Sequence, residues 1–226
     1  MTTRFNRILF DYDGTLIIHD KNTEGEIIAK LLNIDEEKIP EFVKRLNYLF
    51  EISYGRYYYR NHKMTYELFY SLLERIMNPF GNFGITAKEL DDAINYKSIY
   101  LTDLAPNAVE VLEYLSSKGY KLCVFTNGFY MPQAKNMREH KIYNYFERVY
   151  SWDCYYAKPD IRALYRALDG TNPKENVMIG DGITSDIIPA KRLGVYTIGY
   201  NIENIQRAKT LPDVVITDLA ELKQIL

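Results

Sequence analysis

Five short apolar segments recur along the chain, four of them after residue 120. They are Arg7–Phe10, Lys121–Phe125, Val177–Ile179, Val195–Ile198 and Val214–Ile216. Each is followed by polar or glycine-containing residues and then by apolar positions at helical spacing. Strands that alternate with helices in this way are typical of a parallel sheet with crossover helices. The pattern therefore predicts an α/β protein built on a parallel sheet.

Helix signals fill the spaces between these strands. The segment between Pro106 and Gly119 carries three apolar positions on one helical face, namely Val109, Leu112 and Leu115. A second helix is expected to open at Pro159, because proline is favoured in the first turn of a helix. A third is expected to follow Ser185 and to end at Gly194.

Residues 17–100 break this rhythm, because their apolar positions recur only at helical spacing. Two sequences typical of N-terminal capping boxes, Thr23–Glu26 and Thr86–Glu89, precede apolar helical segments. We therefore expect a helical insert directly after the first strand. The predicted domains are an α/β core of residues 1–16 and 101–226 and a helical cap of residues 17–100.

Composition narrows the class of protein. The chain has 226 residues, of which 47% are hydrophobic and 26% charged, as in ordinary soluble globular proteins. Its net charge of -2 provides neither a basic surface for nucleic acid nor a polybasic membrane anchor. Neither a signal peptide nor a membrane-spanning run is expected from the sequence. Two cysteines cannot form a disulfide framework, so we expect a cytoplasmic protein.

The first polar cluster, Asp11-Tyr12-Asp13, comes directly after the strand predicted at Arg7–Phe10. Two carboxylates at the carboxyl end of a parallel strand lie where open α/β sheets bind ligands. An aspartate pair is equally compatible with a turn in which the side chains accept hydrogen bonds from nearby amides. Taken alone, this cluster leaves both interpretations open.

Two more clusters follow in the second half of the chain. Thr126-Asn127-Gly128 ends the Lys121–Phe125 strand, and its hydroxyl and amides are suited to holding phosphate oxygens. A strand-ending Asn-Gly turn explains the same residues as well. Lys158 precedes Pro159, which keeps the preceding residue extended, so this side chain would project from a fixed backbone. A solvated surface lysine is the simpler interpretation of this position by itself.

The fourth cluster runs from Gly180 to Asp186, after the Val177–Ile179 strand. Its glycines allow a sharp turn, and Asp181 and Asp186 bracket that turn. Asp186 is compatible with an ordinary helix cap. The same explanation accounts poorly for Asp181.

The four clusters occur in the order Asp-x-Asp, Thr, Lys and Asp…Asp, and three of them directly follow predicted strands. In this order they resemble the four motifs of the haloacid dehalogenase (HAD) superfamily. The resemblance covers residues 5–16 and 101–226 and implies a Rossmann-like core, with the insert at the place of the superfamily's alpha-helical cap. The Thr126-Asn127-Gly128 run and the Asp181–Asp186 run look most similar to YjjG-like nucleotidases, in a subgroup with phosphoglycolate phosphatases.

The resemblance implies a role for each catalytic position. Asp11 would attack phosphorus and form an aspartyl-phosphate, and Asp13 would protonate the leaving oxygen and later activate water. The phosphoryl group would be bound by Thr126, Asn127, Gly128 and Lys158, with Lys158 also offsetting the charge of Asp11. The second aspartate favours phosphate-ester chemistry, because the dehalogenase branch lacks it.

A metal ion completes the implied site. The resemblance implies oxygen ligands from Asp11, Asp13, Asp181 and Asp186, with Asp186 either a ligand or a support for one. Like charges ~4 Å apart repel by roughly 1–4 kcal/mol per pair at effective dielectrics of 80 to 20. One lysine cannot balance these carboxylates and a phosphate, and an all-oxygen site favours Mg²⁺ over zinc.

The expected function is a magnesium-dependent phosphatase acting on a small phosphate monoester, such as a nucleoside monophosphate. Its expected partner is that phosphorylated metabolite, with no nucleic acid polymer and no membrane, and the protein would be a monomer or homodimer. Two alternatives stay open: a phosphosugar mutase resembling beta-phosphoglucomutase, and a non-catalytic phosphometabolite-binding protein. The tyrosine-rich stretch Tyr54–His62 in the cap is suited either to contacting the leaving group or to packing between helices.

Overall fold

The computed structural model describes residues 5–18, 21–59, 65–98, 102–153, 156–202 and 205–226. Of the tyrosine-rich stretch Tyr54–His62, residues 60–62 and all the side chains lie outside the described residues. The described part of the chain contains no helix that is both long enough and apolar enough to cross a membrane.

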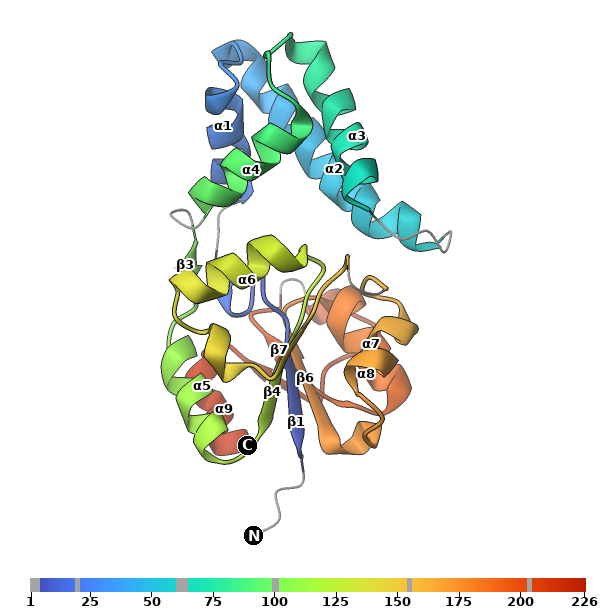
Figure 1. Cartoon of the computed structure of the whole chain (residues 1–226). Coiled ribbons are helices and arrows are strands. Elements are labelled where there is room, and N and C mark those ends of the chain that lie inside the picture. The colour runs from blue at the N-terminus through green and yellow to red at the C-terminus, as the bar shows by residue number, and fades with distance from the viewer. Residues whose placement is uncertain (1–4, 19–20, 60–64, 99–101, 154–155, 203–204) are drawn as a thin grey trace. The chain divides into compact units, whose positions relative to one another are not determined.

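A six-stranded sheet forms the centre of the α/β core (Figure 1). Its strands are β1 (Arg7–Phe10), β4 (Lys121–Phe125), β5 (Arg148–Tyr150), β6 (Asn176–Gly180), β7 (Tyr196–Tyr200) and β8 (Val214–Ile216). They lie in the order β5-β4-β1-β6-β7-β8, and every neighbouring pair is parallel. The predicted Rossmann-like α/β fold is confirmed. The sequence prediction omitted β5, whose three residues do not form an apolar run.

Helices cover both faces of this sheet. They are α5 (Ala108–Ser117), α6 (Tyr130–Glu139), α7 (Ile161–Ala167), α8 (Ile188–Leu193) and α9 (Leu222–Ile225). A π-helical turn at Ile183–Ile187 leads into α8. Single 3₁₀ turns lie at Glu36–Lys38, Asn78–Phe80, Tyr143–Tyr145, Pro173–Glu175, Ile205–Arg207 and Leu219–Glu221.

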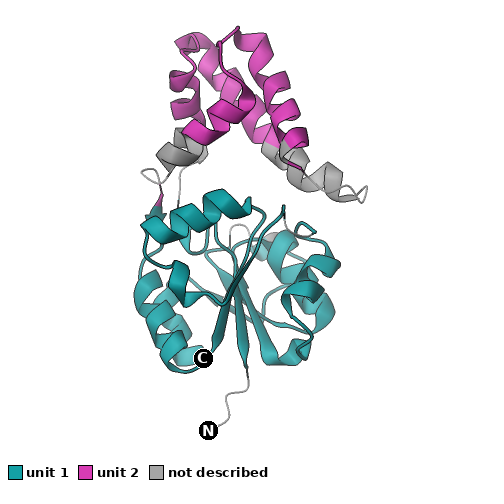
Figure 2. Ribbon diagram, in the orientation of Figure 1, with its two compact units in different colours: residues 1–18, 103–226 teal, residues 19–102 magenta. Residues whose placement is uncertain are grey.

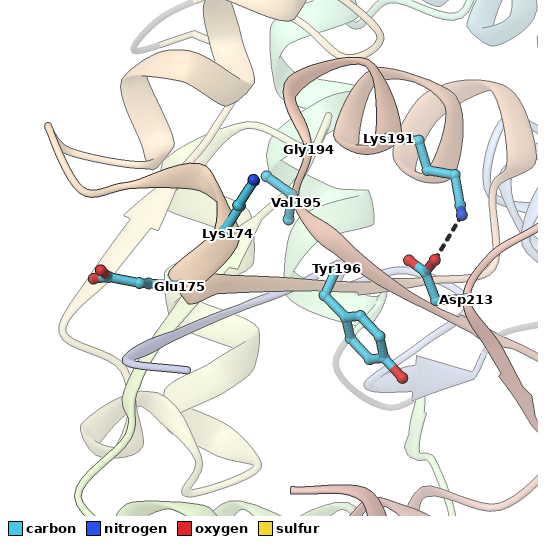
Figure 3. A pocket seen from close by; sticks show the side chains of 7 residues that line it. All are labelled: Lys174, Glu175, Lys191, Gly194, Val195, Tyr196 and Asp213. Carbon is cyan, nitrogen blue, oxygen red and sulfur yellow. Dashed lines mark hydrogen bonds and ion pairs between the residues drawn. The ribbon is translucent and has the colours of Figure 1, made fainter. Parts of the chain in front are cut away.

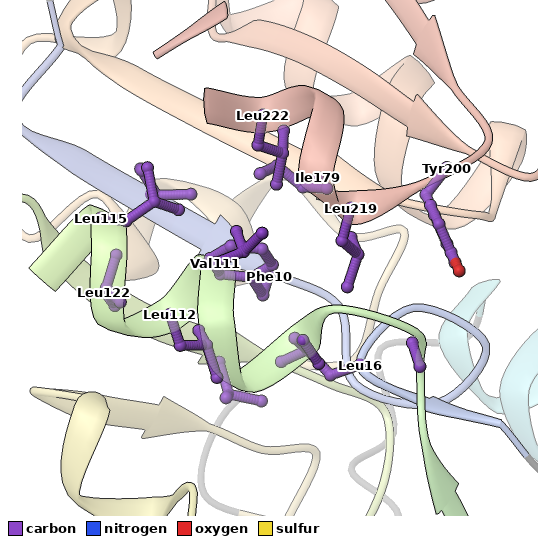
Figure 4. Packing of buried hydrophobic residues seen from close by; sticks show 14 of the residues in the cluster. Phe10, Leu16, Val111, Leu112, Leu115, Leu122, Ile179, Tyr200, Leu219 and Leu222 are labelled. Atoms are coloured by element: carbon purple, nitrogen blue, oxygen red, sulfur yellow. The ribbon is translucent and has the colours of Figure 1, made fainter. Parts of the chain in front are cut away.

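Alternate residues of β1 enter two separate hydrophobic clusters, because successive strand side chains point to opposite faces. Ile8 and Phe10 pack in one cluster with α5 and α9 (Figure 4). Leu9 packs in the other with Cys123 and with residues of α7 and α8. Ile8, Leu9 and Phe10 are fully buried, which explains why they form an unbroken apolar run, and the charged Arg7 is buried beside them.

The helix after Lys158 begins two residues later than predicted. Helix α7 starts at Ile161, and Asp160 is its N-cap, with its Oδ1 accepting a hydrogen bond from the Arg162 backbone N–H at 2.8 Å. Pro159 therefore precedes the helix instead of opening it. The physical reason is that a side-chain acceptor is needed for the first free amides, and Asp160 provides it.

Four longer helices make up the insert: α1 (Lys21–Leu31), α2 (Ile39–Tyr59), α3 (Tyr66–Met77) and α4 (Ala87–Ser98). The predicted box at Thr86 is confirmed, since Thr86 and Glu89 exchange side-chain to backbone hydrogen bonds of 2.7 and 3.2 Å. The box predicted at Thr23–Glu26 is wrong, because α1 already includes Lys21 and Thr23 lies inside the helix.

The chain divides into two compact units (Figure 2). Unit 1 comprises residues 1–18 and 103–226, and unit 2 comprises residues 19–102. The strands β2 (Ile17–Ile18) and β3 (Asp103–Leu104) form an antiparallel pair. This pairing assigns residues 17 and 18 to the core unit, whereas the sequence boundary had placed them in the cap.

The packing of α5 gives a matched pair of substitutions. Leu112 is fully buried in the cluster of Figure 4, whereas Val109 on the same helix is 38% exposed. Leu112→Ala is expected to lower the free energy of unfolding by about 2–5 kcal/mol. Val109→Ala is expected to change it by less than about 0.5 kcal/mol. Denaturant unfolding followed by the fluorescence of Trp152, the single tryptophan and a residue of unit 1, measures both; equal effects would contradict this packing.

Candidate active site

The predicted polar clusters meet because three of their strands are neighbours. β1 lies between β4 and β6 and runs parallel to both. Asp11, Thr126 and Asp181 each come directly after the last residue of one of these strands. The carboxyl ends of parallel strands lie at one edge of a sheet, so the three side chains gather at the same edge.

Lys158 reaches this edge from the loop before α7. Its Nζ donates hydrogen bonds to Oδ1 of Asp11 at 2.6 Å and to Oδ1 of Asp186 at 2.8 Å. All three side chains are buried, and Lys158 is only 3% exposed. The interpretation of Lys158 as a solvated surface lysine is therefore wrong.

The backbone of Lys158 is held by Asn127. The Asn127 amide accepts from the Lys158 N–H at 2.7 Å and donates to the Lys158 carbonyl at 3.1 Å. Binding of phosphate by the amides of this turn stays a prediction, whereas both ends of the Asn127 side-chain amide contact this backbone. Its place in the site is thus to fix the Lys158 loop against the end of β4.

Asp186 is fixed on its other side by its own turn. Oδ2 of Asp186 accepts from the Gly182 backbone N–H at 3.0 Å and from the Ser185 hydroxyl at 3.1 Å. With Lys158 on Oδ1, both carboxylate oxygens have donors. The helix-cap interpretation of Asp186 is wrong, because Asp186 lies inside the turn Ile183–Ile187 and neither this turn nor α8 has a side-chain cap.

Three carboxylates are close enough together to share one cation. Asp11, Asp181 and Asp186 each offer an oxygen, and these oxygens all lie within 4.8 Å of one another. Gly14 makes room for this group: its φ is +82°, and a Cβ there would lie 2.5 Å from Oδ2 of Asp181. An all-oxygen donor set of this kind fits a hard divalent cation. The carboxylate of Asp13 is not one of the three.

The protonation of these groups follows from their burial. Burial raises the pKa of Asp11 to about 6, with Lys158 opposing the shift and Asp181 adding to it. Burial likewise raises the pKa of Asp186 to about 6 against the effect of Lys158. Burial and the charge of Asp186 raise the pKa of Asp181. Burial alone would lower the pKa of Lys158, but Asp11 and Asp186 together raise it.

Asp13 lies on the α6 side of the site. Its Oδ2 accepts a hydrogen bond from Nε2 of Gln133 at 2.8 Å. The neighbouring Tyr12 donates its hydroxyl to Oδ1 of Asn136 at 2.6 Å. Sequence reasoning missed both Gln133 and Asn136, because a polar residue on a helix carries no motif of its own. Only their spacing of three residues, which puts them on one helical face, was available as a signal.

Thr126 is buried beside Asp11's strand. Its backbone N–H donates to the carbonyl of Tyr150 at 2.9 Å, which joins the ends of β4 and β5. Its Oγ1 accepts from the Gly128 N–H at 2.9 Å. The hydroxyl hydrogen of Thr126 is not used in this bond and stays available for donation.

A separate hollow lies at the opposite edge of the sheet, near residues that precede β6, β7 and β8 (Figure 3). Its lining consists of Lys174, Glu175, Lys191, Gly194, Val195, Tyr196 and Asp213. The lining holds two lysines and two acids, and Lys191 forms an ion pair with Asp213 at 2.7 Å. This charge balance favours neither an anion nor a cation, so the carboxyl edge remains the candidate site.

Comparison with known proteins identifies relatives that match either nearly the whole chain or about half of it. Glyceraldehyde 3-phosphate phosphatase of Pyrococcus furiosus is 28% identical over 232 residues, which cover 99% of this chain and 93% of that protein. The protein of the same name from Methanothermobacter thermautotrophicus is 33% identical over 130 residues. That match spans 54% of this chain and 58% of the relative.

Solved structures share the fold. The HAD-hydrolase YfnB of Bacillus subtilis, determined with bound magnesium, superposes with a TM-score of 0.73 at 19% identity. That alignment covers 99% of both chains. A HAD phosphatase of Thermococcus onnurineus superposes with a TM-score of 0.68 at 23% identity over 98% of this chain and 97% of that one.

The family model for haloacid dehalogenase-like hydrolases matches residues 5–194. This range contains all four polar clusters and most of both units. The chain is therefore an enzyme of the haloacid dehalogenase-like hydrolase family.

Proposed function

We propose that this enzyme is a magnesium-dependent phosphatase that hydrolyses a small phosphate monoester through an aspartyl-phosphate on Asp11. The observation that carries the proposal is the environment of the Asp11 carboxylate at the end of the central strand. Its Oδ1 accepts from both the Tyr12 N–H at 2.7 Å and Lys158 Nζ at 2.6 Å. We assign the attack on phosphorus to Oδ2, because Oδ1 is already held by two donors.

Lys158 and Thr126 supply the positive and donor groups for the phosphoryl oxygens. Transfer of a phosphoryl group depends on positioning and charge neutralisation more than on elaborate covalent chemistry. The Lys158 ammonium lies within hydrogen-bond distance of Asp11 and is charged at neutral pH. The Thr126 hydroxyl can donate, because the Gly128 amide occupies its acceptor side.

Asp11, Asp181 and Asp186 would hold Mg²⁺, which when bound would neutralise charge on the phosphoryl oxygens. Three carboxylates face one ammonium, so the group by itself has an excess of negative charge. We assign the carboxylate of Asp13 to proton transfer instead of metal binding. It accepts a hydrogen bond from Gln133 and is not one of the three clustered carboxylates.

Asp13 supports phosphate-ester chemistry over dehalogenation. An alkoxide leaving group needs a proton, and a carboxyl group two residues from the nucleophile can supply it and later accept one from water. The resemblance that first suggested the family implies that the dehalogenase branch lacks this aspartate. A mutase of the same fold would return the phosphoryl group to sugar, so the release of inorganic phosphate separates the two reactions.

The names of relatives narrow the substrate to small phosphometabolites. Besides the glyceraldehyde 3-phosphate phosphatases, they include phosphoglycolate phosphatase of Agrobacterium fabrum at 30% identity and pyrophosphatase PpaX of Bacillus cereus at 25%. A phosphate-release screen of these three substrates and of nucleoside monophosphates tests the substrate class. We propose a cytoplasmic monomer or homodimer acting on one such metabolite.

Substitution of Asp11 tests the nucleophile. Asp11→Asn is expected to lower magnesium-dependent phosphate release from p-nitrophenyl phosphate by at least about a thousandfold, because a nucleophile cannot be replaced by binding alone. Asp103→Asn, an exposed acid of the same unit, is expected to keep wild-type turnover. Full activity in Asp11→Asn would contradict the assignment. Wild-type protein that releases no phosphate from any ester with Mg²⁺ would contradict the proposed reaction.

Magnesium binding is expected to depend on pH. The raised pKa values of Asp11 and Asp186, about 6, mean that protons leave these carboxyls as the pH rises through that value. Charged ligands are thus available above about pH 6, and protons compete with the metal below it. Magnesium at about 100 times its Kd should stabilise the fold by about 2.7 kcal/mol. The shift in melting temperature should shrink between about pH 7.5 and about pH 5.

Asp181→Asn is the variant for this measurement, because it removes one ligand. It should reduce the magnesium-induced shift in melting temperature at about pH 7.5. Asp92→Asn, whose exposed carboxylate pairs with Lys88 in unit 2, is the control and should leave the shift unchanged. A shift that is the same in Asp181→Asn as in wild type would show that the metal binds elsewhere.

A further inference from the structure

Gln133 lies outside every polar cluster that marks the active site in the sequence, yet its side chain contacts Asp13. We propose that Gln133 is a positioning residue, which fixes the carboxyl group of Asp13 for proton transfer to the leaving group. This inference rests on the proposed phosphatase function, because it assigns Asp13 the role of acid and base.

The contact orients one oxygen of Asp13. Nε2 of Gln133 donates to Oδ2 of Asp13 at 2.8 Å, and this pair is partly buried. The bond fixes rotation of the carboxyl group about its last side-chain torsion, which is otherwise broad. Oδ1 is then the oxygen presented for proton transfer. A proton donor must lie within about 2.6–3.2 Å of the atom it protonates, so a defined orientation is required.

Helix α6 holds the backbone of Gln133 in place. The helix is held at its first residue by Asp153, whose Oδ1 accepts from the Tyr130 N–H at 2.9 Å. One turn beyond Gln133, Asn136 accepts the Tyr12 hydroxyl at 2.6 Å. Residues three apart share one helical face. Helix α6 therefore holds two successive residues of the nucleophile loop, Tyr12 and Asp13, through two side chains of one face.

Gly128 provides the space that this arrangement needs. A Cβ on Gly128 would overlap Nε2 of Gln133 and would lie 2.7 Å from its Cδ. The amide of Gln133 thus lies directly over the Thr126-Asn127-Gly128 turn. Its Oε1 is buried and has no hydrogen-bond partner among the described residues. Donation to Asp13 is the polar contact that orients this amide, since its other end is unsatisfied.

The leaving group distinguishes positioning of Asp13 from a merely structural role. Nitrophenolate departs with little need of a proton, whereas the alkoxide of glyceraldehyde 3-phosphate or phosphoglycolate needs one. Gln133→Met keeps the size of the side chain and removes the donor. It is expected to lower kcat/KM for the alkyl ester about 100-fold and for p-nitrophenyl phosphate less than about 10-fold.

Two further variants serve as a positive reference and as a control for this measurement. Asp13→Asn is expected to show the same selectivity for the leaving group, with a larger loss on the alkyl ester. Glu139→Gln, an exposed change on the same helix, should keep wild-type turnover on both esters. Equal losses on both esters in Gln133→Met, or no loss on either, would overturn the positioning role.

A double-mutant cycle tests the contact from its other side. Gly128→Ala should displace the Gln133 amide and lower turnover of the alkyl ester in the wild-type background. In the Gln133→Ala background the same change should cost much less, because no amide is left to displace. Costs that are equal in both backgrounds would contradict the inference. Wild-type protein that hydrolyses neither ester would instead refute the phosphatase proposal, and this inference with it.

Discussion

The ammonium of Lys158, buried between Asp11 and Asp186, joins the parts of the chain that make up the site. Its two hydrogen bonds, at 2.6 and 2.8 Å, connect the end of β1, the loop before α7 and the turn after β6. Removing one partner from a buried ion pair typically costs about 3–5 kcal/mol, because the other charge is left without compensation. The three segments are therefore constrained by one another, and each can occupy its place only when the others do.

The contact of Lys158 with Asp11 and Asp186 also explains why the site favours binding of a second cation. Burial raises the pKa of both carboxyls even with Lys158 in place, because one ammonium offsets the cost of burying two carboxylates only in part. A divalent ion held by Asp11, Asp181 and Asp186 would add the missing positive charge. The excess negative charge at this edge is thus a property of the residues themselves, and it suits the binding of a cation more than the stability of the metal-free fold.

Much of the core could be predicted because strands buried on both faces leave unbroken apolar runs in the sequence. Ile8, Leu9 and Phe10 pack into two clusters on opposite faces of the sheet, so all three positions must be apolar. β5 was missed for the opposite reason, because it is a short edge strand with little burial. The helix start at Asp160 was also misjudged, since a proline and a capping aspartate stood side by side and only one of them bonds to the helix.

Within the site, the sequence revealed the residues suited to chemistry but not those that hold them in position. Asp11, Thr126 and Asp181 were recognisable because each follows a strand, and Lys158 because it precedes Pro159. For Asn127 nothing in the sequence indicated that its side-chain amide would span the backbone of Lys158, because a turn residue carries no pattern for such a contact.

Gln133 belongs to no motif in the sequence, because its proposed role depends on a contact 120 residues away in sequence. A catalytic group needs a particular residue type at the end of a strand, and this requirement leaves a pattern in the sequence. A supporting group needs only a donor or acceptor that reaches the right atom, and many residues on many elements can meet that need. For this reason the chemistry of the site could be inferred from the sequence, whereas the geometry that makes it effective required the fold.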